Sequence, residues 1–417
     1  MGWCRVGLAV LVAMILWCTS GPTAVAQESS SASGSSGSSQ VINPQRDPMK
    51  MYPAPIPDPW VVPFPGYENT PPGTILASRP VGVPLQLVPA ATTQLLVRST
   101  DSHGVPMPVV TTVMVPTTPW PGPGPRPVIA YNTAIDSLGL TCVPSWTIPR
   151  AMEIEIVPIQ YLLSRNYAVV VTDHQGPKQA YAGGRLSGNA VLDALRASVH
   201  AQFLGLAPNA PIAISGYSGG AIAAGWAAER QADYAPELNV VGTAMGGAPV
   251  DYRILFASMN GANLASGVFL AAALGVAREY PQLFALLNDN GYRLGAIAKD
   301  LCLAQLAPLG VAPVTVQALS DVPNVVDLPV VQQVLDDTRM GKSAPRAPVL
   351  LYQGQQDFWI PRAGAIQLRN TWCAEGGNVA YDEKFGEHLL AVAWGFPIAF
   401  GWIEDRLAGR PMAPGCG

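Results

Sequence analysis

The middle of the chain alternates between short apolar runs and segments whose apolar residues recur three and four positions apart. The apolar runs are typical of buried strands, and the spaced segments are typical of helices. The strand-like runs lie at residues 128–131, 167–171, 212–215 and 239–245, and the helix-like segments lie at residues 159–163, 190–200 and 220–228. Strands that are apolar throughout usually belong to a parallel sheet covered on both faces. The pattern therefore predicts an α/β fold with a mostly parallel central sheet flanked by helices.

A different pattern precedes this alternation. Residues 51–80 are dense in proline, which favours an extended segment on the surface of a domain. Three short runs rich in β-branched residues follow, at residues 83–88, 93–99 and 109–116. We interpret residues 51–125 as a proline-rich extension that leads into antiparallel strands at the start of the sheet.

The alternation of strands and helices stops at about residue 250. Residues 251–344 are mostly helical in pattern, and a strand-like run returns at residues 348–352. This arrangement predicts an α/β core made of residues 126–250 and 345–417, interrupted by a helical insertion. The insertion is either a lid that gates access to a site or a cap with no gating role.

The N-terminus has the features of a secretory signal peptide at residues 1–26. Arg5 precedes an apolar run at residues 7–17, and Ala24-Val25-Ala26 supplies small residues at a cleavage site. The alternative is a membrane anchor, but the run is shorter than the roughly 20 residues of a spanning helix. We expect a secreted protein, released or held at the cell wall, with no integral membrane segment after cleavage. Residues 27–50, rich in Ser and Gly, should form a disordered leader.

Composition narrows the function classes. Hydrophobic residues make up 49% of the chain and charged residues 12%, and the formal net charge is −4. This balance favours a large buried fold and gives no reason to expect a nucleic-acid partner; we expect a monomer. Removal of the signal peptide would leave four of the six cysteines, namely Cys142, Cys302, Cys373 and Cys416. In an oxidising compartment these should form two disulfides, for which three pairings are possible.

One motif carries candidate chemistry. Gly216-Tyr217-Ser218-Gly219-Gly220 fits G-x-S-x-G, with a strand-like run directly before it and a helix-like segment directly after it. In the α/β-hydrolase fold this strand–turn–helix lifts the serine hydroxyl above the sheet, where it can act as a nucleophile. The alternative is an ordinary glycine-rich turn. We predict that Ser218 is the nucleophile.

A serine nucleophile needs a base and an orienting acid, which follow it in this fold in the order acid, then histidine. Of the four histidines, His103, His174 and His200 precede Ser218, so the order selects His388 as the base. Asp357 lies just after the strand-like run at residues 348–352 and is the predicted acid. The competing acids are Asp382, Glu383 and Glu387.

The oxyanion hole should use the backbone N–H of Gly219 and a donor from the loop at residues 132–139. Asp136 in that loop either belongs to the oxyanion hole or caps a turn or helix. The aromatic pair Phe358-Trp359 either lines an acyl pocket or packs in the core. Asp173-His174 lacks a further His or Cys at ligand spacing, and no phosphate-binding loop is present. We therefore expect no metal and no cofactor.

Taken together, these residues resemble the secretory lipase family, from about residue 55 to the C-terminus. The motifs that carry the resemblance are Gly-Tyr-Ser218-Gly-Gly, Tyr-Gln-Gly-Gln-Gln-Asp357, Gly-Glu-His388, Pro72-Gly-Thr-Ile-Leu76, Asp173-His-Gln-Gly-Pro177 and Val191-Leu-Asp-Ala-Leu-Arg-Ala197. The resemblance implies an oxyanion hole at Asp136 and Gly219 and a helical lid at residues 251–344. It also implies disulfides Cys142–Cys302 and Cys373–Cys416.

The resemblance implies hydrolysis of triacylglycerols or related lipid esters through an acyl-enzyme, at a lipid–water interface. Two other functions remain open. The first is a carboxylesterase or acyltransferase that acts on short or more polar esters, such as acetyl esters or polyesters. The second is a binding protein without catalysis on a hydrolase scaffold.

Overall fold

The fold is described from a computed structural model of the 417-residue chain. The structure describes residues 46–312 and 314–416. The expected signal peptide and nearly all of the expected leader therefore lie outside the described residues. The chain divides into one unit that ends at Asp47 and a second unit, Pro48–Gly417, which contains the sheet and the helices.

A nine-stranded sheet forms the centre of this unit, with the order β1-β2-β3-β5-β4-β6-β7-β8-β9. The strands are β1 (Ile75–Pro80), β2 (Ala90–Thr100), β3 (Pro106–Pro116), β4 (Val128–Asn132), β5 (Ala168–Thr172), β6 (Ile212–Tyr217), β7 (Val240–Gly246), β8 (Val349–Gly354) and β9 (Val379–Lys384). The pairs from β1 to β5 in this order are antiparallel, and all later pairs are parallel. The predicted mostly parallel sheet with an antiparallel start is confirmed.

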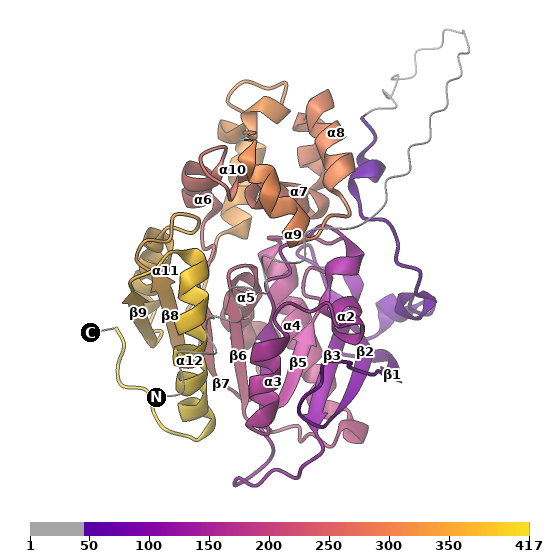
Figure 1. Ribbon diagram of the computed structural model, residues 1–417, viewed down its shortest axis with the longest axis vertical. Helices are drawn as coiled ribbons and strands as arrows, with labels where there is room; N and C mark the ends of the chain where they lie inside the picture. Colours follow the sequence, from indigo (N-terminus) through magenta and orange to yellow (C-terminus); the bar gives the residue numbers. More distant parts are fainter. Residues whose placement is uncertain (1–45, 313, 417) are drawn as a thin grey trace. The chain divides into compact units, whose positions relative to one another are not determined.

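Helices cover both faces of the sheet, as the strands' continuous apolar runs predict. In β4, Ile129 and Tyr131 pack on one face with the apolar residues of α3 and α12, whereas Val128 and Ala130 pack on the other face with those of α4, α5 and α11. Figure 1 shows α3 and α12 in front of the strands. The bounds are α3 (Ile156–Ser164), α4 (Gly184–His200), α5 (Gly219–Tyr234), α11 (Arg362–Ala374) and α12 (His388–Leu407).

A block of helices lies between β7 and β8. It contains α6 (Tyr252–Met259), α7 (Ser266–Glu279), α8 (Asp289–Ala298), α9 (Leu303–Leu306) and α10 (Pro329–Thr338). In Figure 1 these helices gather beyond one end of the sheet. The disulfide Cys142–Cys302 ties this block to the short helix α2 region (Pro144–Thr147), and the disulfide Cys373–Cys416 joins α11 to the C-terminal segment.

The strand predicted at residues 83–88 is wrong. These residues form a loop between β1 and β2, and the outermost strand is instead β1, within the proline-rich segment. Pro84 and the following Pro89 lack the N–H groups that a sheet ladder needs. The N–H groups of Leu87 and Val88 donate instead to the side-chain oxygen of Gln160, at 2.8 and 3.0 Å.

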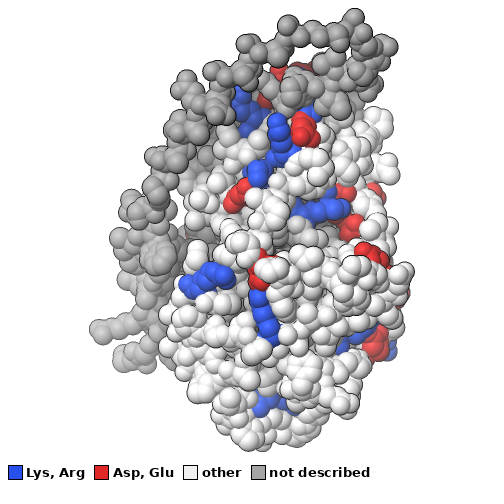
Figure 2. Space-filling view, turned by 90° about the vertical axis from the view of Figure 1, so that its right-hand side faces the viewer, with Lys and Arg blue, Asp and Glu red and all other residues white. Residues whose placement is uncertain are grey.

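One face of the molecule carries few charges. Charged side chains are sparse on the face drawn in Figure 2, in keeping with their 12% share of the sequence. Within residues 46–312 and 314–416, no helix is both long enough and apolar enough to cross a bilayer.

Candidate active site

Ser218 lies at the sharp turn between β6 and α5. Its backbone adopts φ 53° and ψ −121°, a strained conformation for a residue with a side chain. Tight packing fixes the turn: a β-carbon at Gly216 would clash with the carbonyl oxygen of Gly220, and one at Gly220 would clash with that of Asn132. The two flanking glycines of the motif are therefore required by the close approach of backbone to backbone.

Three of the predicted site residues meet just beyond the carboxyl ends of the parallel strands β6, β8 and β9. The Ser218 hydroxyl lies 2.9 Å from Nε2 of His388, and Nδ1 of His388 lies 2.7 Å from Oδ2 of Asp357. Because a carboxylate only accepts hydrogen bonds, Nδ1 carries the proton and Nε2 is free to accept from the hydroxyl. Residues far apart in the sequence thus form one chain of hydrogen bonds.

The competing acids do not reach the imidazole. Asp382 accepts hydrogen bonds from Lys384, and Glu383 accepts one from Arg362. Glu387 caps the N-terminus of α12, where its carboxylate accepts from the N–H groups of Leu389 and Leu390. Asp357 is the acid that contacts His388.

Three further hydrogen bonds fix the carboxylate of Asp357. The side-chain amide of Gln353 donates to Oδ2 at 2.9 Å, and the backbone N–H groups of Trp359 and Ile360 donate to Oδ1 at 3.1 and 2.8 Å. Gln353 also donates to the carbonyl of Ile360, at 2.8 Å. Sequence reasoning missed Gln353, although its position at the end of a buried strand was a signal that it could have used.

Aromatic rings hold the imidazole of His388 from two sides. Trp359 stacks on it with ring centroids 5.4 Å apart and planes 21° apart, and the Tyr217 ring lies 5.1 Å away. The Tyr217 hydroxyl also donates to the backbone carbonyl of His388 at 2.6 Å. Of the pair Phe358-Trp359, the second residue therefore contacts the site, whereas the side chain of Phe358 is exposed.

Asp136 lies against Gly219, the first residue of α5. A β-carbon at Gly219 would clash with Oδ1 of Asp136, which is buried and has no aligned hydrogen bond among the described residues. Burial raises the pKa of Asp136 to about 6, although the nearby His388, Tyr181, Gly219 and Ser218 each lower it. Sequence reasoning missed Tyr181, whose hydroxyl approaches the Asp136 carboxyl. The carboxyl can therefore be neutral in mildly acidic solution.

A second buried carboxyl shapes the loop that carries Asp136. Glu155 accepts hydrogen bonds from the Tyr131 hydroxyl at 2.5 Å and from the N–H of Ala134 at 2.6 Å. Burial raises the pKa of Glu155 to about 8. This contact fixes the start of the loop just beyond β4.

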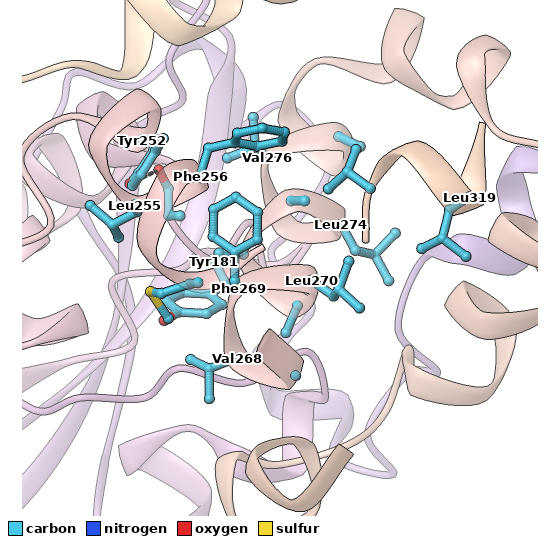
Figure 3. A pocket seen from close by; sticks show the side chains of 18 of the residues that line it. Tyr181, Tyr252, Leu255, Phe256, Val268, Phe269, Leu270, Leu274, Val276 and Leu319 are labelled. Atoms are coloured by element: carbon cyan, nitrogen blue, oxygen red, sulfur yellow. Dashed lines mark hydrogen bonds between the residues drawn. The ribbon is translucent and has the colours of Figure 1, made fainter. Parts of the chain in front are cut away.

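An apolar cavity of about 330 Å³ extends from Ser218 and Asp136 into the helical block. Figure 3 shows Phe269, Leu270 and Leu274 of α7 converging on it, with Tyr252 and Phe256 of α6 alongside. The volume lies within the roughly 300–1,000 Å³ typical of small-molecule sites. The wall is apolar almost throughout, so it suits a hydrocarbon chain better than a polar group.

The remaining sequence candidates have structural partners. His174 is buried, donates a hydrogen bond from Nε2 to the Thr133 carbonyl 3.0 Å away, and has its pKa lowered by burial to about 4. The Asp173 carboxyl accepts hydrogen bonds from the N–H and the hydroxyl of Ser145. Across the described part of the chain, no three His, Cys, Asp or Glu side chains are grouped so that they could hold a metal ion.

Comparison with known proteins agrees with this architecture. The chain is similar to a protein named "Probable inactive lipase MT1628" of Mycobacterium tuberculosis, at 32% identity over 92% of this chain and 90% of that protein. It is equally similar, at 32% identity, to "Secreted triacylglycerol lipase LIP5" of Malassezia globosa, over 87% of this chain and 81% of the relative.

Among solved structures, the chain resembles lipase A of Candida antarctica. The TM-score is 0.80 at 26% identity, and the match covers 86% of this chain and 88% of that one. The sequence pattern of the family described as "Secretory lipase" matches residues 144–415. The fold is thus that of an α/β-hydrolase similar to lipase A, and the chain belongs to the secretory lipase family.

Proposed function

We propose that this protein is a secreted lipase that hydrolyses carboxylic esters of lipids, with Ser218 as nucleophile, His388 as base and Asp357 as orienting acid. The observation that carries the proposal is the chain of hydrogen bonds from the Ser218 hydroxyl through His388 to Asp357, at the mouth of an apolar cavity. A serine hydroxyl becomes reactive only when such a base accepts its proton.

The reaction would run in two halves. Ser218 attacks the ester carbonyl while Nε2 of His388 takes the hydroxyl proton, and Asp357 stabilises the imidazolium that results. His388 then gives that proton to the leaving alcohol, which leaves an acyl-enzyme. Water, activated by His388 in turn, attacks the acyl carbonyl and releases the fatty acid.

The tetrahedral intermediate carries a negative charge on oxygen. In our proposal the N–H of Gly219 and the neutral carboxyl of Asp136 both donate hydrogen bonds to this oxygen. Two features support this role: Gly219 begins α5, where N–H groups are free and the helix dipole favours negative charge, and the pKa of Asp136 is raised. One such donor typically contributes roughly 3 kcal/mol to transition-state stability.

The cavity supports an apolar acyl chain as the substrate group. Its lining includes Tyr252, Phe256, Phe269, Leu274, Leu319 and Trp359. Burial of methylene groups there would contribute about 0.8 kcal/mol for each group. In this proposal the helical block between β7 and β8 is the lid that supplies most of the acyl-chain site.

We further propose that the protein acts at a lipid surface. Leu264, Val311 and Phe358 are 59%, 74% and 49% exposed. They lie near one another, since Asn263 donates to the carbonyl of Phe358 and the Leu264 carbonyl packs against Gly310. We call these three exposed side chains the apolar rim. No Lys, Arg, Asp or Glu occurs in residues 254–277 and 301–320, which supply most of this rim. An uncharged apolar rim beside a lipid cavity fits a lipid phase.

The similarity to a protein named as probably inactive makes a direct test of catalysis the first experiment. The purified chain should be labelled covalently at Ser218 by a fluorophosphonate, and Ser218→Ala should abolish the label. The chain should hydrolyse p-nitrophenyl esters from butyrate to palmitate, with higher kcat/KM for the longer chains. Loss of a triad residue should lower kcat by roughly 10⁴-fold or more.

A matched control is Ser215→Ala, which removes a buried hydroxyl from β6 just before the motif. It should leave both labelling and hydrolysis intact. Absence of label on the wild-type chain would overturn the proposed catalysis. Labelling combined with a preference for acetyl esters over palmitate would retain the catalytic residues but reject the lipid substrate.

A further inference from the structure

Arg278 is a fully buried cation near the C-terminal end of α7, in the helical block. Its guanidinium makes five hydrogen bonds, and each acceptor is a backbone carbonyl oxygen. The acceptors are Met51 at 2.9 Å, Leu138 at 2.7 Å, Lys178 at 3.2 Å, Gln179 at 3.1 Å and Lys299 at 2.8 Å. No ion pair with a carboxylate joins it among the described residues.

Two of the segments that Arg278 binds lead to Asp136, which belongs to the proposed oxyanion hole, and to Tyr181, which contacts Asp136. Leu138 follows Asp136 by two residues, in the loop after β4. Gln179 precedes Tyr181 by two residues, in the loop after β5, and the Tyr181 hydroxyl approaches the Asp136 carboxyl. A single guanidinium therefore joins the backbone of the loop that holds Asp136 to that of the loop that holds Tyr181.

Both loops contain strained backbone. Asp136, Gln179 and Ala182 have φ angles of 42°, 49° and 68°, in the left-handed region that residues with side chains avoid. Such conformations persist only where surrounding contacts determine them. Arg278 supplies contacts of this kind, because it binds the carbonyl of Gln179 itself and that of Leu138.

The other acceptors connect this point to the helical block. Lys299 lies three residues before Cys302. Cys302 forms a disulfide with Cys142, which lies just after the loop that holds Asp136 and Leu138. The N–H of Leu138 donates to the carbonyl of Leu301 at 3.0 Å. Burial lowers the pKa of Arg278 to about 10. The guanidinium therefore stays protonated at neutral pH and keeps all of its N–H donors.

We infer that Arg278 is a positioning residue for the reaction proposed above: it aligns the Asp136 and Tyr181 loops and so couples the helical block to the oxyanion hole. The inference rests on the proposed function. A guanidinium suits this task, because its planar fork donates in several fixed directions at once, which a lysine ammonium cannot reproduce.

The test compares Arg278→Met and Arg278→Lys with the wild type on a soluble ester, p-nitrophenyl butyrate. Misplacing catalytic groups by about 1 Å can lower the rate by about 100-fold. We expect kcat to fall by about 100-fold in Arg278→Met and about tenfold in Arg278→Lys, with KM within about threefold of wild type. Combined with Tyr181→Phe, the losses should be far from multiplicative, because both residues act through the same loops.

The matched control is Arg406→Met. Arg406 is also a buried arginine bonded to a backbone carbonyl, but it lies at the other end of α12 from His388. At a temperature where the variant remains folded, its kcat should stay within about twofold of wild type, and its effect should multiply with that of Tyr181→Phe.

Amide hydrogen exchange gives a readout that does not require catalysis. Arg278→Lys should speed exchange in residues 133–139 and 176–183 together, whereas Arg406→Met should not. The inference fails if a folded Arg278 variant keeps wild-type kcat, if its loss multiplies with that of Tyr181→Phe, or if exchange in both loops is unchanged. If Arg278→Met does not fold, Arg278→Lys decides by the same criteria. Failure of the proposed function is a separate result, namely no fluorophosphonate label on the wild type.

Discussion

The carboxyl of Asp136 packs directly on Gly219, so closely that Gly219 has no room for a β-carbon. The carboxyl is buried, one of its oxygens lacks an aligned hydrogen bond among the described residues, and its pKa is raised to about 6. The protonation state of Asp136 therefore decides whether this carboxyl offers a hydrogen-bond donor or a negative charge to the substrate. A neutral carboxyl can donate to a developing oxyanion, whereas a carboxylate attracts the Gly219 N–H and repels the oxyanion.

This relationship predicts a pH dependence of catalysis. Below about pH 6 Asp136 is neutral and can donate, and above it the donor is lost. We expect kcat/KM for a soluble ester to fall at least tenfold between pH 6 and pH 8, since a lost oxyanion donor typically costs about 100-fold or more.

Asp136→Asn tests the assignment. An amide donates an N–H at every pH, so the decrease in kcat/KM between pH 6 and pH 8 should disappear. Asp193→Asn is the matched control, since Asp193 is a buried carboxyl on α4 whose pKa is also raised to about 6. If kcat/KM of Asp136→Asn still falls between pH 6 and pH 8, another group causes the decrease.

Gly219→Ala should lower kcat by about 100-fold with little change in folding, because the new methyl group must push the Asp136 carboxyl away. Gly225→Ala, on the same helix, is the control. Its β-carbon would meet the flexible thioether of Met340 at 2.7 Å, so it should cost some stability but not kcat. Steady-state kinetics and thermal melts of the two variants distinguish these effects, and equal kcat losses would contradict the prediction.

Much of the fold could be predicted from periodicity alone. The apolar runs at β4, β5, β6, β7 and β8 are uninterrupted because both faces of those strands are buried. β1 could not be predicted in this way, because its pattern is masked by flanking prolines and it pairs with one neighbour only. The residues proposed as the triad were found by their order along the chain, which the fold class supplies.

The contacts that hold the site together were not predicted from the sequence, although Gln353 stands at the end of a buried strand. Gln353 binds Asp357 across a turn, and Tyr181 approaches Asp136 from another loop. Arg278 binds Leu138, which lies 140 residues away in the sequence. Such contacts depend on loop geometry, and no periodic pattern of hydrophobic residues encodes it.

The exposed apolar rim predicts a difference between two kinds of substrate. Val311→Ser and Phe358→Ser together should lower activity on an emulsified triacylglycerol by at least tenfold, because two exposed apolar side chains, each contributing about 1.5–3 kcal/mol when fully buried, no longer enter the lipid phase. Activity on dissolved p-nitrophenyl butyrate should stay within about twofold. Phe203→Ser is the control, since Phe203 is 63% exposed but lies just after α4, near the amino end of β6. Equal losses on both substrates would reject the rim as a lipid-binding surface.

The protein should be more stable in mildly acidic than in mildly alkaline solution. Burial raises the pKa of six carboxyls, namely that of Glu153 and those of Asp136 and Asp193 to about 6, of Asp173 and Glu229 to about 7, and of Glu155 to about 8. A carboxyl whose pKa is raised by folding stabilises the folded state fully at a pH below its pKa in the unfolded chain, which is near 4. This stabilisation is lost as the pH rises through the pKa of the same carboxyl in the folded protein. His174 acts in the opposite direction, since its pKa is lowered to about 4 and stability is lost as pH falls below about 6.5.

The six raised carboxyls outnumber the one histidine, so the free energy of unfolding should decrease from pH 5 to pH 8. Each unit of pKa shift corresponds to about 1.4 kcal/mol, so the melting temperature should fall by about 5 °C or more over this range. Glu229→Gln isolates one contribution. Its carboxyl accepts hydrogen bonds from Lys342 N–H and Trp372 Nε1, away from the candidate site, and the variant should flatten the pH dependence without changing kcat. A melting temperature that rises from pH 5 to pH 8 would contradict the assignment of these carboxyls as neutral buried groups.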